Sequence, residues 1–209
     1  MCEASERPDL QRWNQRFLRE DYLFGTEPNA FLAGERGRLR AGQRALAIAD
    51  GEGRNGVWLA MQGLDVLSID FSSVALKKAA ALASERGVSL KTQVADLDDW
   101  TWQADRFDVV AAIFIQFAGP KLRERIFAGI CRTLAPGGLL LLQGYRPEQL
   151  AYGTGGPSQA ENMYTASLLR SAFAELDILR LKEHDSVVHE GTGHDGMAAL
   201  VDLVARKPG

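Results

Sequence analysis

Short hydrophobic runs alternate with amphipathic helical patterns along most of the chain from residue 44 onward. A short apolar run bounded by turn-forming residues is typical of a buried strand, and apolar positions three and four apart indicate a helix. The strand-like runs are Leu46–Asp50, Leu64–Asp70, Val88–Val94, Phe107–Ile115 and Leu139–Leu142. The helix-like segments are Arg54–Met61, Ser72–Arg86 and Pro120–Leu134. This alternation predicts an open, mostly parallel sheet with helices on both faces.

The C-terminal part departs from this pattern. A helix over Ala166–Ala174, with Thr165 as its N-cap, precedes two further strand-like runs at Leu176–Lys182 and Met197–Ala205. The glycine-containing segment between the two runs predicts a loop that joins antiparallel strands. We therefore expect seven strands in one sheet, mostly parallel, with an antiparallel C-terminal strand.

Two segments outside this core are expected to cover the sheet or the site. Leu10, Trp13 and Phe17 share one helical face within residues 8–20, and an aromatic loop, Tyr22–Asn29, follows. Residues 145–164 show no period, and a loop of that length inside a compact domain is usually functional. We expect one domain over residues 1–209, with an N-terminal helix and lid loop over 1–43 and the core over 44–209.

Composition narrows the function classes. The 209 residues are 46% hydrophobic and 24% charged, which is typical of a globular protein. A formal net charge of −3 gives no basic excess for nucleic acid, and no apolar run is long enough for a membrane span. Cys2 and Cys131 cannot form a disulfide framework, and Met1–Asp9 lacks the pattern of a signal peptide. We expect a soluble cytoplasmic protein without a nucleic-acid or membrane partner.

A glycine loop between the first strand and the first helix carries the sharpest chemical signal. Gly51, Gly53 and Gly56 allow close approach of the backbone to a ligand at a helix N-terminus. Asp70 ends the second strand, where a carboxylate can accept both hydroxyls of a ribose. The alternative is a tight turn with a helix-capping aspartate, but strands on both sides favour nucleoside binding. The spacing alone also fits a dinucleotide.

Further motifs narrow this choice. Asp96 and Leu97 follow the third strand, Phe107–Val110 opens the fourth, and Pro136–Gly138 precedes the fifth. With the loop Leu46–Ala60, these motifs resemble those of class I S-adenosylmethionine-dependent methyltransferases, a Rossmann-like fold family, over nearly the whole chain. Gly25–Asn29, the Gly-Glu-Gly-Arg-Asn run and the segment from Gln143 to Pro157 resemble the tellurite-resistance (TehB-like) branch. The resemblance implies S-adenosyl-L-methionine as cofactor.

The resemblance also implies roles for individual positions. Asp50 to Gly53 would surround the methionine part of the cofactor, Asp70 the ribose, and Asp96 with Leu97 the adenine. The expected cofactor-binding residues are Asp50, Gly51, Glu52, Gly53, Asn55, Asp70, Phe71, Ser72, Asp96, Leu97 and Ile113. One departure is Ala47, which stands where the family usually has an acidic residue. Asp50 would supply the missing negative charge near the cofactor's ammonium group, or cofactor affinity would be weakened.

The acceptor side is less defined. Aromatic faces favour a cationic sulfonium, so Tyr22 and Phe24 are expected in a lid. The acceptor pocket is expected to contain residues from the fourth and fifth strands and the long loop, namely Phe114, Gln116, Tyr145, Arg146 and Tyr164. Arg146 is either a partner for an anionic acceptor or a solvated side chain. No catalytic residue follows from the sequence.

Other cysteine and histidine positions carry less chemistry. His184, His189 and His194 recur at five-residue steps, which suit neither a helix face nor a strand face. We expect surface histidines and no metal site, with a loop histidine acting as base as the less favoured alternative. Cys131 is expected to be buried and inert.

Three functions follow. The first is a methyltransferase acting in line on a small-molecule acceptor, such as a thiol, a chalcogen oxyanion or another soft nucleophile. The second is a regulatory module that binds the cofactor without catalysis. The third, a nicotinamide-dependent reductase, rests on glycine spacing alone.

Overall fold

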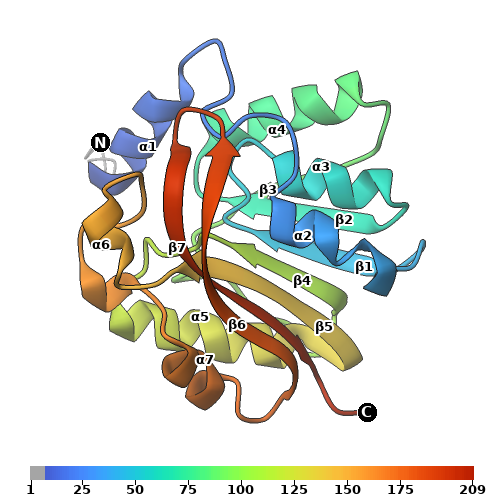
Figure 1. Cartoon of the computed structure of the whole chain (residues 1–209). Helices are drawn as coiled ribbons and strands as arrows, with labels where there is room; N and C mark the ends of the chain where they lie inside the picture. The colour runs from blue at the N-terminus through green and yellow to red at the C-terminus, as the bar shows by residue number, and fades with distance from the viewer. Residues whose placement is uncertain (1–7) are drawn as a thin grey trace, which may run out of the picture.

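The computed structural model describes residues 8–209, which build one seven-stranded sheet with helices on both faces (Figure 1). Cys2 and most of the Met1–Asp9 segment lie outside the described residues. The strand order is β3-β2-β1-β4-β5-β7-β6. Strands β1 to β5 pair in parallel, whereas β7 pairs antiparallel with both β5 and β6. The predicted fold class is confirmed.

The elements follow the hydrophobic pattern closely in the first two thirds of the chain. The strands are β1 Arg44–Ile48, β2 Asp65–Asp70, β3 Lys91–Val94, β4 Phe107–Ile113, β5 Leu134–Tyr145, β6 Asp177–Glu190 and β7 His194–Arg206. The α-helices are α1 Pro8–Phe17, α2 Ala30–Gly34, α3 Arg54–Met61, α4 Ser73–Glu85, α5 Pro120–Thr133, α6 Gln149–Tyr152 and α7 Ala166–Ala172. Two short 3₁₀ turns cover Arg36–Arg38 and Ala160–Asn162.

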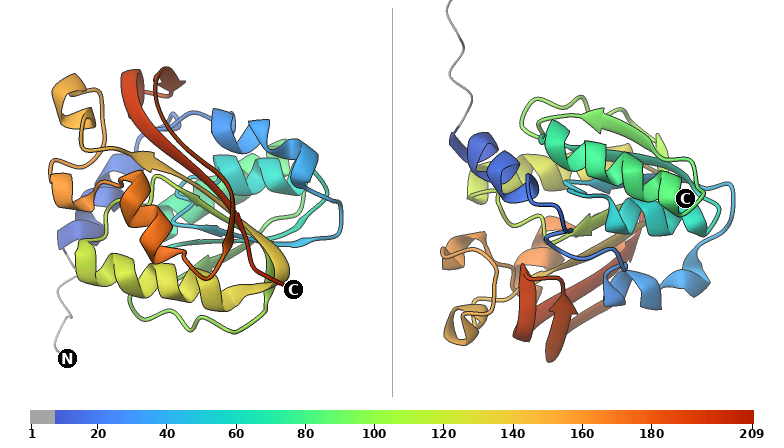
Figure 2. Two further views of the ribbon diagram at one scale, coloured as in Figure 1. Left: turned by 60° about the horizontal axis from the view of Figure 1, so that its bottom comes forward. Right: turned by 90° about the horizontal axis from the view of Figure 1, so that it is seen from above.

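Alternate side chains of the central strands enter two separate cores, which is why those strands are apolar at nearly every position. Leu140 and Leu142 of β5 pack with Ile126 of α5 on one face. Leu139 and Leu141 pack on the other face with residues of α2 and α3. Helices α5 and α7 cover the first face, and α2 and α3 cover the second (Figures 1 and 2).

Local capping explains the helix starts. Ser72 accepts a hydrogen bond from the Ala75 amide, and Thr165, the predicted N-cap of α7, accepts one from the Leu168 amide. Pro120 stands at the start of α5, where its missing N–H costs nothing. These sequence-local signals place the helix ends within two or three residues of the predicted ones.

The C-terminal hairpin differs from the expectation. Strands β6 and β7 pair over their full length up to Glu190 and His194, so only Gly191–Gly193 forms the connection. The segment predicted as a loop is therefore mostly strand. Residues Lys182–Ser186 of β6 are all polar and none of them is buried, so the apolar alternation that indicates a strand is missing there. The 145–164 segment contains α6 and a 3₁₀ turn.

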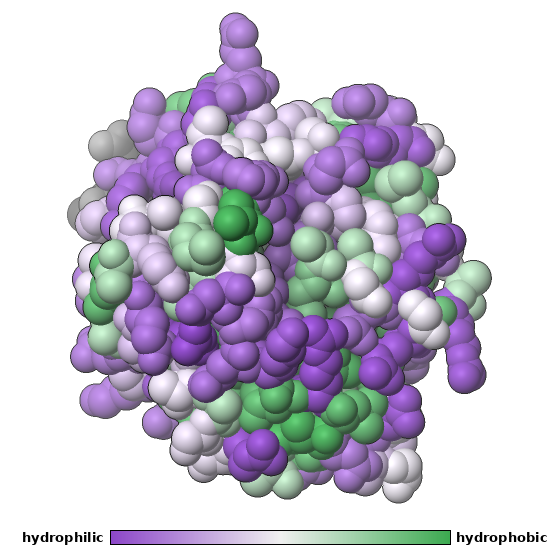
Figure 3. All heavy atoms as spheres, viewed as in Figure 1, coloured by the Kyte–Doolittle hydropathy of each residue, from purple (hydrophilic) through white to green (hydrophobic). Residues whose placement is uncertain are grey.

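The surface of one face is mainly hydrophilic, with a small apolar area where β6 begins (Figure 3). Leu179, which lies there, is 40% exposed. Among residues 8–209, no helix combines the length and the apolarity that a membrane span needs.

Candidate functional site

A cavity of about 550 Å³ opens at the carboxyl ends of β1, β2, β3 and β4. Helix α1, the tip of the β6–β7 hairpin and the loop after α6 close its other sides. Open parallel sheets bind ligands at this edge, where the strand order reverses between β1 and β4. The lining includes Arg12, Trp13, Arg16, Phe17, Phe24, Ala49, Asp50, Gly51, Arg54, Asn55, Asp70, Phe71, Ala95, Asp96, Leu97, Ile113, Phe114, Gln116, Phe117, Tyr145, Gly155–Gln159, Asn162, Gly193 and His194.

The glycine loop forms one end of the cavity, and Asp70 holds its backbone. The Gly51 amide donates to Asp70 Oδ2 at 2.9 Å, and the Ser72 amide donates to Oδ1 at 2.8 Å. The φ angle of Gly53 is +87°, and a Cβ there would lie 2.4 Å from the Cβ of Ala79. The loop therefore requires glycine, because α4 packs directly against it. We call this end, formed by Ala49–Gly51, Arg54–Asn55, Asp70–Phe71, Ala95–Leu97 and Ile113, the cofactor half.

Asp50 points back into the protein as well as lining the cavity. Its carboxylate accepts hydrogen bonds from Ser68 Oγ at 2.8 Å and from the Gly56 amide at 3.1 Å. Burial raises the pKa of Asp50 to about 7 and that of Asp70 to about 6, although hydrogen bonds to both carboxylates oppose the shift. Ala47 is buried inside β1. Asp50 is therefore the acidic side chain that the first loop brings to the cavity.

The third strand supplies a carboxylate and an apolar surface. Asp96 and Leu97 follow β3, and Leu97 is buried beside Ala95 in the first core. The Asp98 amide donates to Asp96 Oδ1 at 3.0 Å, which fixes the turn after the strand. Ile113 ends β4 on the opposite wall. An adenine ring would find apolar walls and a hydrogen-bond acceptor in this part.

A row of rings occupies the other end of the cavity. Successive ring centroids are 6.4 Å apart between Trp13 and Phe24, 4.5 Å between Phe24 and His194, and 4.5 Å between His194 and Phe114. Phe114 also stacks on Tyr145 at 4.7 Å. We call this end the acceptor half. It is formed by Arg12, Trp13, Arg16, Phe17, Phe24, Phe114, Gln116, Phe117, Tyr145, Gly155–Gln159, Asn162, Gly193 and His194.

A buried polar network joins the two halves. Arg54, in the first turn of α3, forms an ion pair with Glu190 at the end of β6, and both side chains are less than 10% exposed. Asn29 Nδ2 donates to Glu190 Oε1 at 2.9 Å and to Gln143 Oε1 at 2.7 Å. Attraction to Arg54 and His194 outweighs burial, so the pKa of Glu190 falls to about 2. Glu190 is thus ionised and held from several sides.

His194 lies beside this carboxylate. Its Nδ1 is 3.5 Å from Glu190 Oε2 and is buried without a hydrogen bond. Burial is the largest cause that lowers the pKa of His194, and the positive charges of Arg54 and Arg16 add to it. Because a carboxylate only accepts, the proton of the neutral ring belongs on Nδ1, and Nε2 is left with its lone pair. The expectation of surface histidines is wrong for His194, because the hairpin folds this position over the cavity.

Most of the predicted site residues meet in this cavity. Those that line it are Asp50, Gly51, Asn55, Asp70, Phe71, Asp96, Leu97, Ile113, Phe24, Phe114, Gln116 and Tyr145. Glu52, Gly53 and Ser72 lie behind the cofactor half. Glu52 is buried, accepts from the Leu23 amide at 2.8 Å and forms an ion pair with Lys78. These three residues shape the loop and do not line the cavity.

Three residues predicted for the lid or the acceptor pocket lie elsewhere. Tyr22 packs against the α3–α4 side, and its hydroxyl donates to the Lys78 carbonyl at 3.3 Å. Arg146 forms ion pairs with Glu148 and Asp185 and does not line the cavity. Tyr164 is fully buried in the first core against Phe127. Strand order alone could not tell these side chains from their cavity-facing neighbours.

Several residues in or beside the cavity were not predicted from the sequence. Arg16, Arg54, Glu190 and Asn29 meet only because α1, the N-terminal loop and the hairpin converge on the strand ends. Asn29 and Arg54 do lie in motifs of the resemblance, which was a usable signal. For Glu190 no local signal existed, since its partners Asn29 and Arg54 lie more than 100 residues away in the chain.

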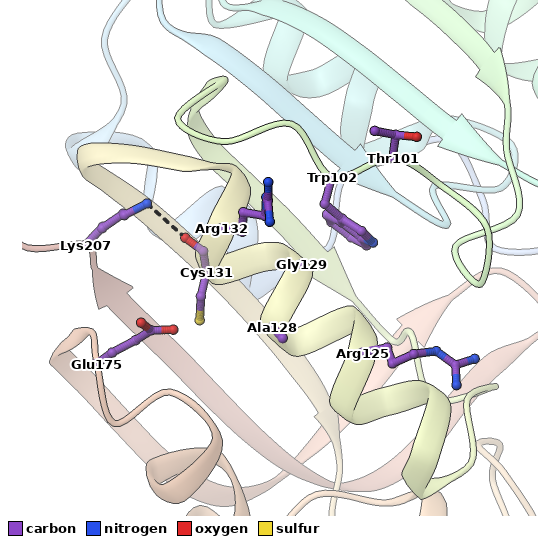
Figure 4. Close-up of a pocket in the computed structure, with 9 residues that line it drawn as sticks. All are labelled: Thr101, Trp102, Arg125, Ala128, Gly129, Cys131, Arg132, Glu175 and Lys207. Atoms are coloured by element: carbon purple, nitrogen blue, oxygen red, sulfur yellow. Dashed lines mark hydrogen bonds between the residues drawn. The ribbon is translucent and has the colours of Figure 1, made fainter.

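A second hollow lies on the outside of α5, away from the strand ends (Figure 4). Lys207 Nζ donates there to the carbonyls of Cys131 and Leu134. Burial raises the pKa of the Cys131 thiol to about 12, so it is inert as a nucleophile, as expected from the sequence. Within residues 8–209, no group of three His, Cys, Asp or Glu side chains is arranged to hold a metal ion.

Residues 45–138 match the family model described as a methyltransferase domain. This segment, 94 of the 209 residues, is therefore similar to a methyltransferase domain, and the sequence motifs imply S-adenosylmethionine as its cofactor. The match covers the glycine loop, Asp70, Asp96 and Ile113. No curated protein sequence is significantly similar to the chain.

Solved structures share the fold over nearly the full length. One described under the conversion of a disulfide bond into a thioacetal group during echinomycin biosynthesis has a TM-score of 0.75 and 22% identity, covering 94% of this chain and 88% of that one. N-methyltransferase NodS from Bradyrhizobium japonicum, with S-adenosyl-L-homocysteine, has a TM-score of 0.70 and 14% identity, covering 96% and 98%. TehB from Haemophilus influenzae has a TM-score of 0.69 and 14% identity, covering 86% and 62%. These similarities support the fold.

The cofactor half fits the group that this domain binds. It offers the open backbone of Gly51, the buried carboxylate of Asp70 and the apolar walls of Leu97 and Ile113. Gly51 has a φ of +58°, and a Cβ there would contact the Phe17 ring at 3.5 Å, in the space between the loop and α1. The chemistry of these residues suits a nucleoside joined to an amino-acid chain.

Proposed function

We propose that the chain transfers the methyl group of S-adenosylmethionine to a small-molecule acceptor that loses a proton. The observation that carries this proposal is a single cavity that joins the cofactor half to His194. Ring walls and the loop after α6 enclose the acceptor half, which favours a small molecule over a polymer. The family match supports the cofactor, and the cavity supports the kind of acceptor.

The bound cofactor supplies a methyl group on a positively charged sulfur, which is open to in-line attack. In-line attack by the acceptor atom would release the sulfur in its neutral form, and His194 Nε2 would take the proton that the acceptor loses. Phe24, Phe114 and Tyr145 exclude water and hold the acceptor near the attack geometry. Glu190 lies beside the protonated Nδ1 and stabilises the charge that the ring gains.

The resemblance extends the proposal to the acceptor atom and the setting. A soft nucleophile such as a thiol or a chalcogen oxyanion remains our proposal for this atom, supported by the TehB-like motifs around Gly25–Asn29 and Gln143–Pro157. We also propose a single functional domain in the cytoplasm without a nucleic-acid partner. The net charge of −3 and the two cysteines support this setting.

Calorimetric titration with S-adenosyl-L-homocysteine tests the cofactor part. We expect stoichiometric binding that Asp70→Ala weakens by about 100-fold, because a buried carboxylate loses charge-assisted hydrogen bonds. Asp65→Ala, an exposed aspartate at the start of the same strand, is the matched control and should leave binding unchanged. Binding of NADH in place of this ligand would favour the reductase alternative.

Mass-spectrometric turnover assays test the catalytic part. Thiol, hydroxyl, amine and chalcogen acceptors are incubated with S-adenosylmethionine and the wild-type chain. Methylated product from one acceptor class supports the proposal. Tight cofactor binding without product across the whole panel would favour the regulatory module.

A further inference from the structure

We propose that the acceptor is an anionic molecule with an aromatic ring, whose anionic group binds Arg16 and whose ring packs along Trp13 and Phe24. This inference rests on the proposed function and names its substrate class. The observation behind it is the Arg16 guanidinium, which lines the cavity beside the Trp13 and Phe24 rings and has no carboxylate partner among residues 8–209.

Arg16 differs from the other charged residues of the cavity. Its guanidinium carbon lies 4.4 Å from the Trp13 ring and 6.0 Å from the Phe24 ring, and it lines the cavity. Within the described residues no ion pair neutralises it. Arg54, the other arginine near the rings, is already neutralised by Glu190. The positive charge available to a ligand therefore comes from α1.

Arg12 strengthens this charge. It precedes Arg16 by one helical turn and also lines the cavity. Like charges at this spacing destabilise a helix, and an anion between them relieves the repulsion. Burial together with the nearby Arg12 and Arg19 lowers the pKa of Arg16.

The negative charges of the cavity lie in the cofactor half. Asp50, Asp70 and Asp96 follow β1, β2 and β3, and each interacts with backbone amides. Glu190 pairs with Arg54. Among residues 8–209, an anionic acceptor thus meets a positive charge at Arg16 that no carboxylate pairs with, whereas a cationic acceptor meets no carboxylate in the lining of the acceptor half.

The rings connect this anion position to the reacting position. From Trp13 the row leads through Phe24 to His194 at centroid steps of 6.4 Å and 4.5 Å. The charge of Arg16 also reaches His194, since it contributes to lowering the histidine's pKa. A flat ring between the two sites gains stacking contacts and places its hydroxyl or thiol toward His194.

Arg146 shows why the role belongs to Arg16. The sequence offered Arg146 as the partner of an anionic acceptor, but Asp185 and Glu148 already neutralise it outside the cavity. Arg16 has the complementary properties: it lines the cavity, contacts the ring row and is not neutralised.

Calorimetry on the chain saturated with S-adenosyl-L-homocysteine tests the inference. The probes are 4-hydroxybenzoate, 4-hydroxyphenylacetate and 4-hydroxycinnamate, each paired with its neutral amide, together with 4-hydroxycyclohexanecarboxylate and selenite. We expect at least one aromatic acid to bind about tenfold or more tightly than its amide, as a charge-assisted guanidinium contact implies. It should also bind more tightly than the cyclohexane acid and selenite.

Substitutions of single arginines test where the anionic group of the acceptor binds. Arg16→Gln should remove the difference between acid and amide, Arg16→Lys should retain part of it, and Arg12→Gln should reduce it slightly. Arg170→Gln removes the same charge from the exposed end of α7 and should change nothing. Titration of the cofactor product into each variant serves as the folding control, with affinity expected within about twofold of wild type.

The inference is wrong if no acid binds more tightly than its amide, or if Arg16→Gln leaves the difference intact. Selenite binding as tightly as the aromatic acids through Arg16 would overturn the aromatic part. These results leave the proposed function standing if the cofactor product still binds. Failure of the wild-type chain to bind that product would instead overturn the proposed function.

Discussion

The two halves of the cavity are built in different ways. Most of the cofactor half comes from loops that directly follow β1, β2 and β3, between Ala49 and Leu97, and it relies on backbone amides and one carboxylate per strand end. The acceptor half combines residues from α1, the ends of β4 and β5, and the hairpin tip, which lie up to about 180 residues apart in the chain. The residues expected to bind the cofactor are therefore close together in the sequence, whereas the residues that would contact the acceptor come together only in the folded chain.

Strained backbone marks the boundary between the halves. Ala49 follows β1 with a φ of +47°, and Phe114 follows β4 with a φ of +55°, both unusual for residues with a side chain. Such strain persists where the surrounding structure enforces it, often at functional sites. Both residues line the cavity, at the ends of the neighbouring strands β1 and β4.

The largest expected effect separates acceptor chemistry from cofactor binding. His194→Gln should reduce methyl transfer about 100-fold or more, because general bases contribute that much, while affinity for S-adenosyl-L-homocysteine stays unchanged. The wild-type rate should rise with pH to a plateau, and the midpoint of the rise should lie below the ordinary histidine pKa, since burial lowers the pKa of His194 and its neutral form is the base. Steady-state kinetics across pH measures both.

His189→Gln is the matched control for this variant. His189 is exposed near the same hairpin tip and pairs with Asp195. It should keep wild-type turnover and the wild-type pH profile. Full turnover in His194→Gln would remove the base from the mechanism and leave positioning alone as the catalytic contribution of the acceptor half.

The same contrast explains what the sequence could predict. The sheet, its helices and the cofactor half follow from apolar runs, glycines and strand-end aspartates that are adjacent in the chain. The two antiparallel C-terminal strands were predicted, but their extension to Glu190 and His194 was missed, because the polar run Lys182–Ser186 shows no strand period. His194 and Arg16 were missed as site residues because no local pattern tells a cavity-facing histidine or arginine from a solvated one.

A smaller effect distinguishes the buried carboxyls of the two halves. The pKa of Asp50 is raised to about 7 in the folded chain, so its contribution to stability is fully present below the unfolded pKa near 4. It is lost as the pH rises through 7. Glu190 has the opposite sign: its pKa is lowered to about 2, and its contribution is lost only as the pH falls toward 2.

Between pH 5.5 and pH 7.5 the free energy of unfolding of the ligand-free chain should therefore fall, with about 2 kcal/mol of the fall due to Asp50. Asp70, with a pKa of about 6, adds to it in the same direction. Urea unfolding at both pH values measures the fall in wild type and in Asp50→Asn, where the Asp50 part should vanish. Asp65→Asn, at an exposed carboxyl, should keep the wild-type fall. Equal falls in wild type and Asp50→Asn would mean that Asp50 is ionised at pH 5.5.

The smallest expected effect concerns Tyr164, which the sequence placed in the acceptor half and the structure places in the core. Its hydroxyl is buried without a hydrogen-bond partner, and burial raises its pKa. Tyr164→Phe should leave turnover unchanged and should leave the free energy of unfolding equal or up to about 1 kcal/mol higher, because an unsatisfied buried polar group is removed. Urea unfolding and the methyl-transfer assay measure the two quantities, and Tyr164→Ala should cost about 3–5 kcal/mol as the core loses a ring. A drop in turnover without a loss of stability in Tyr164→Phe would mean that this hydroxyl takes part in acceptor binding or catalysis. The acceptor half would then extend into the core between β5 and α5.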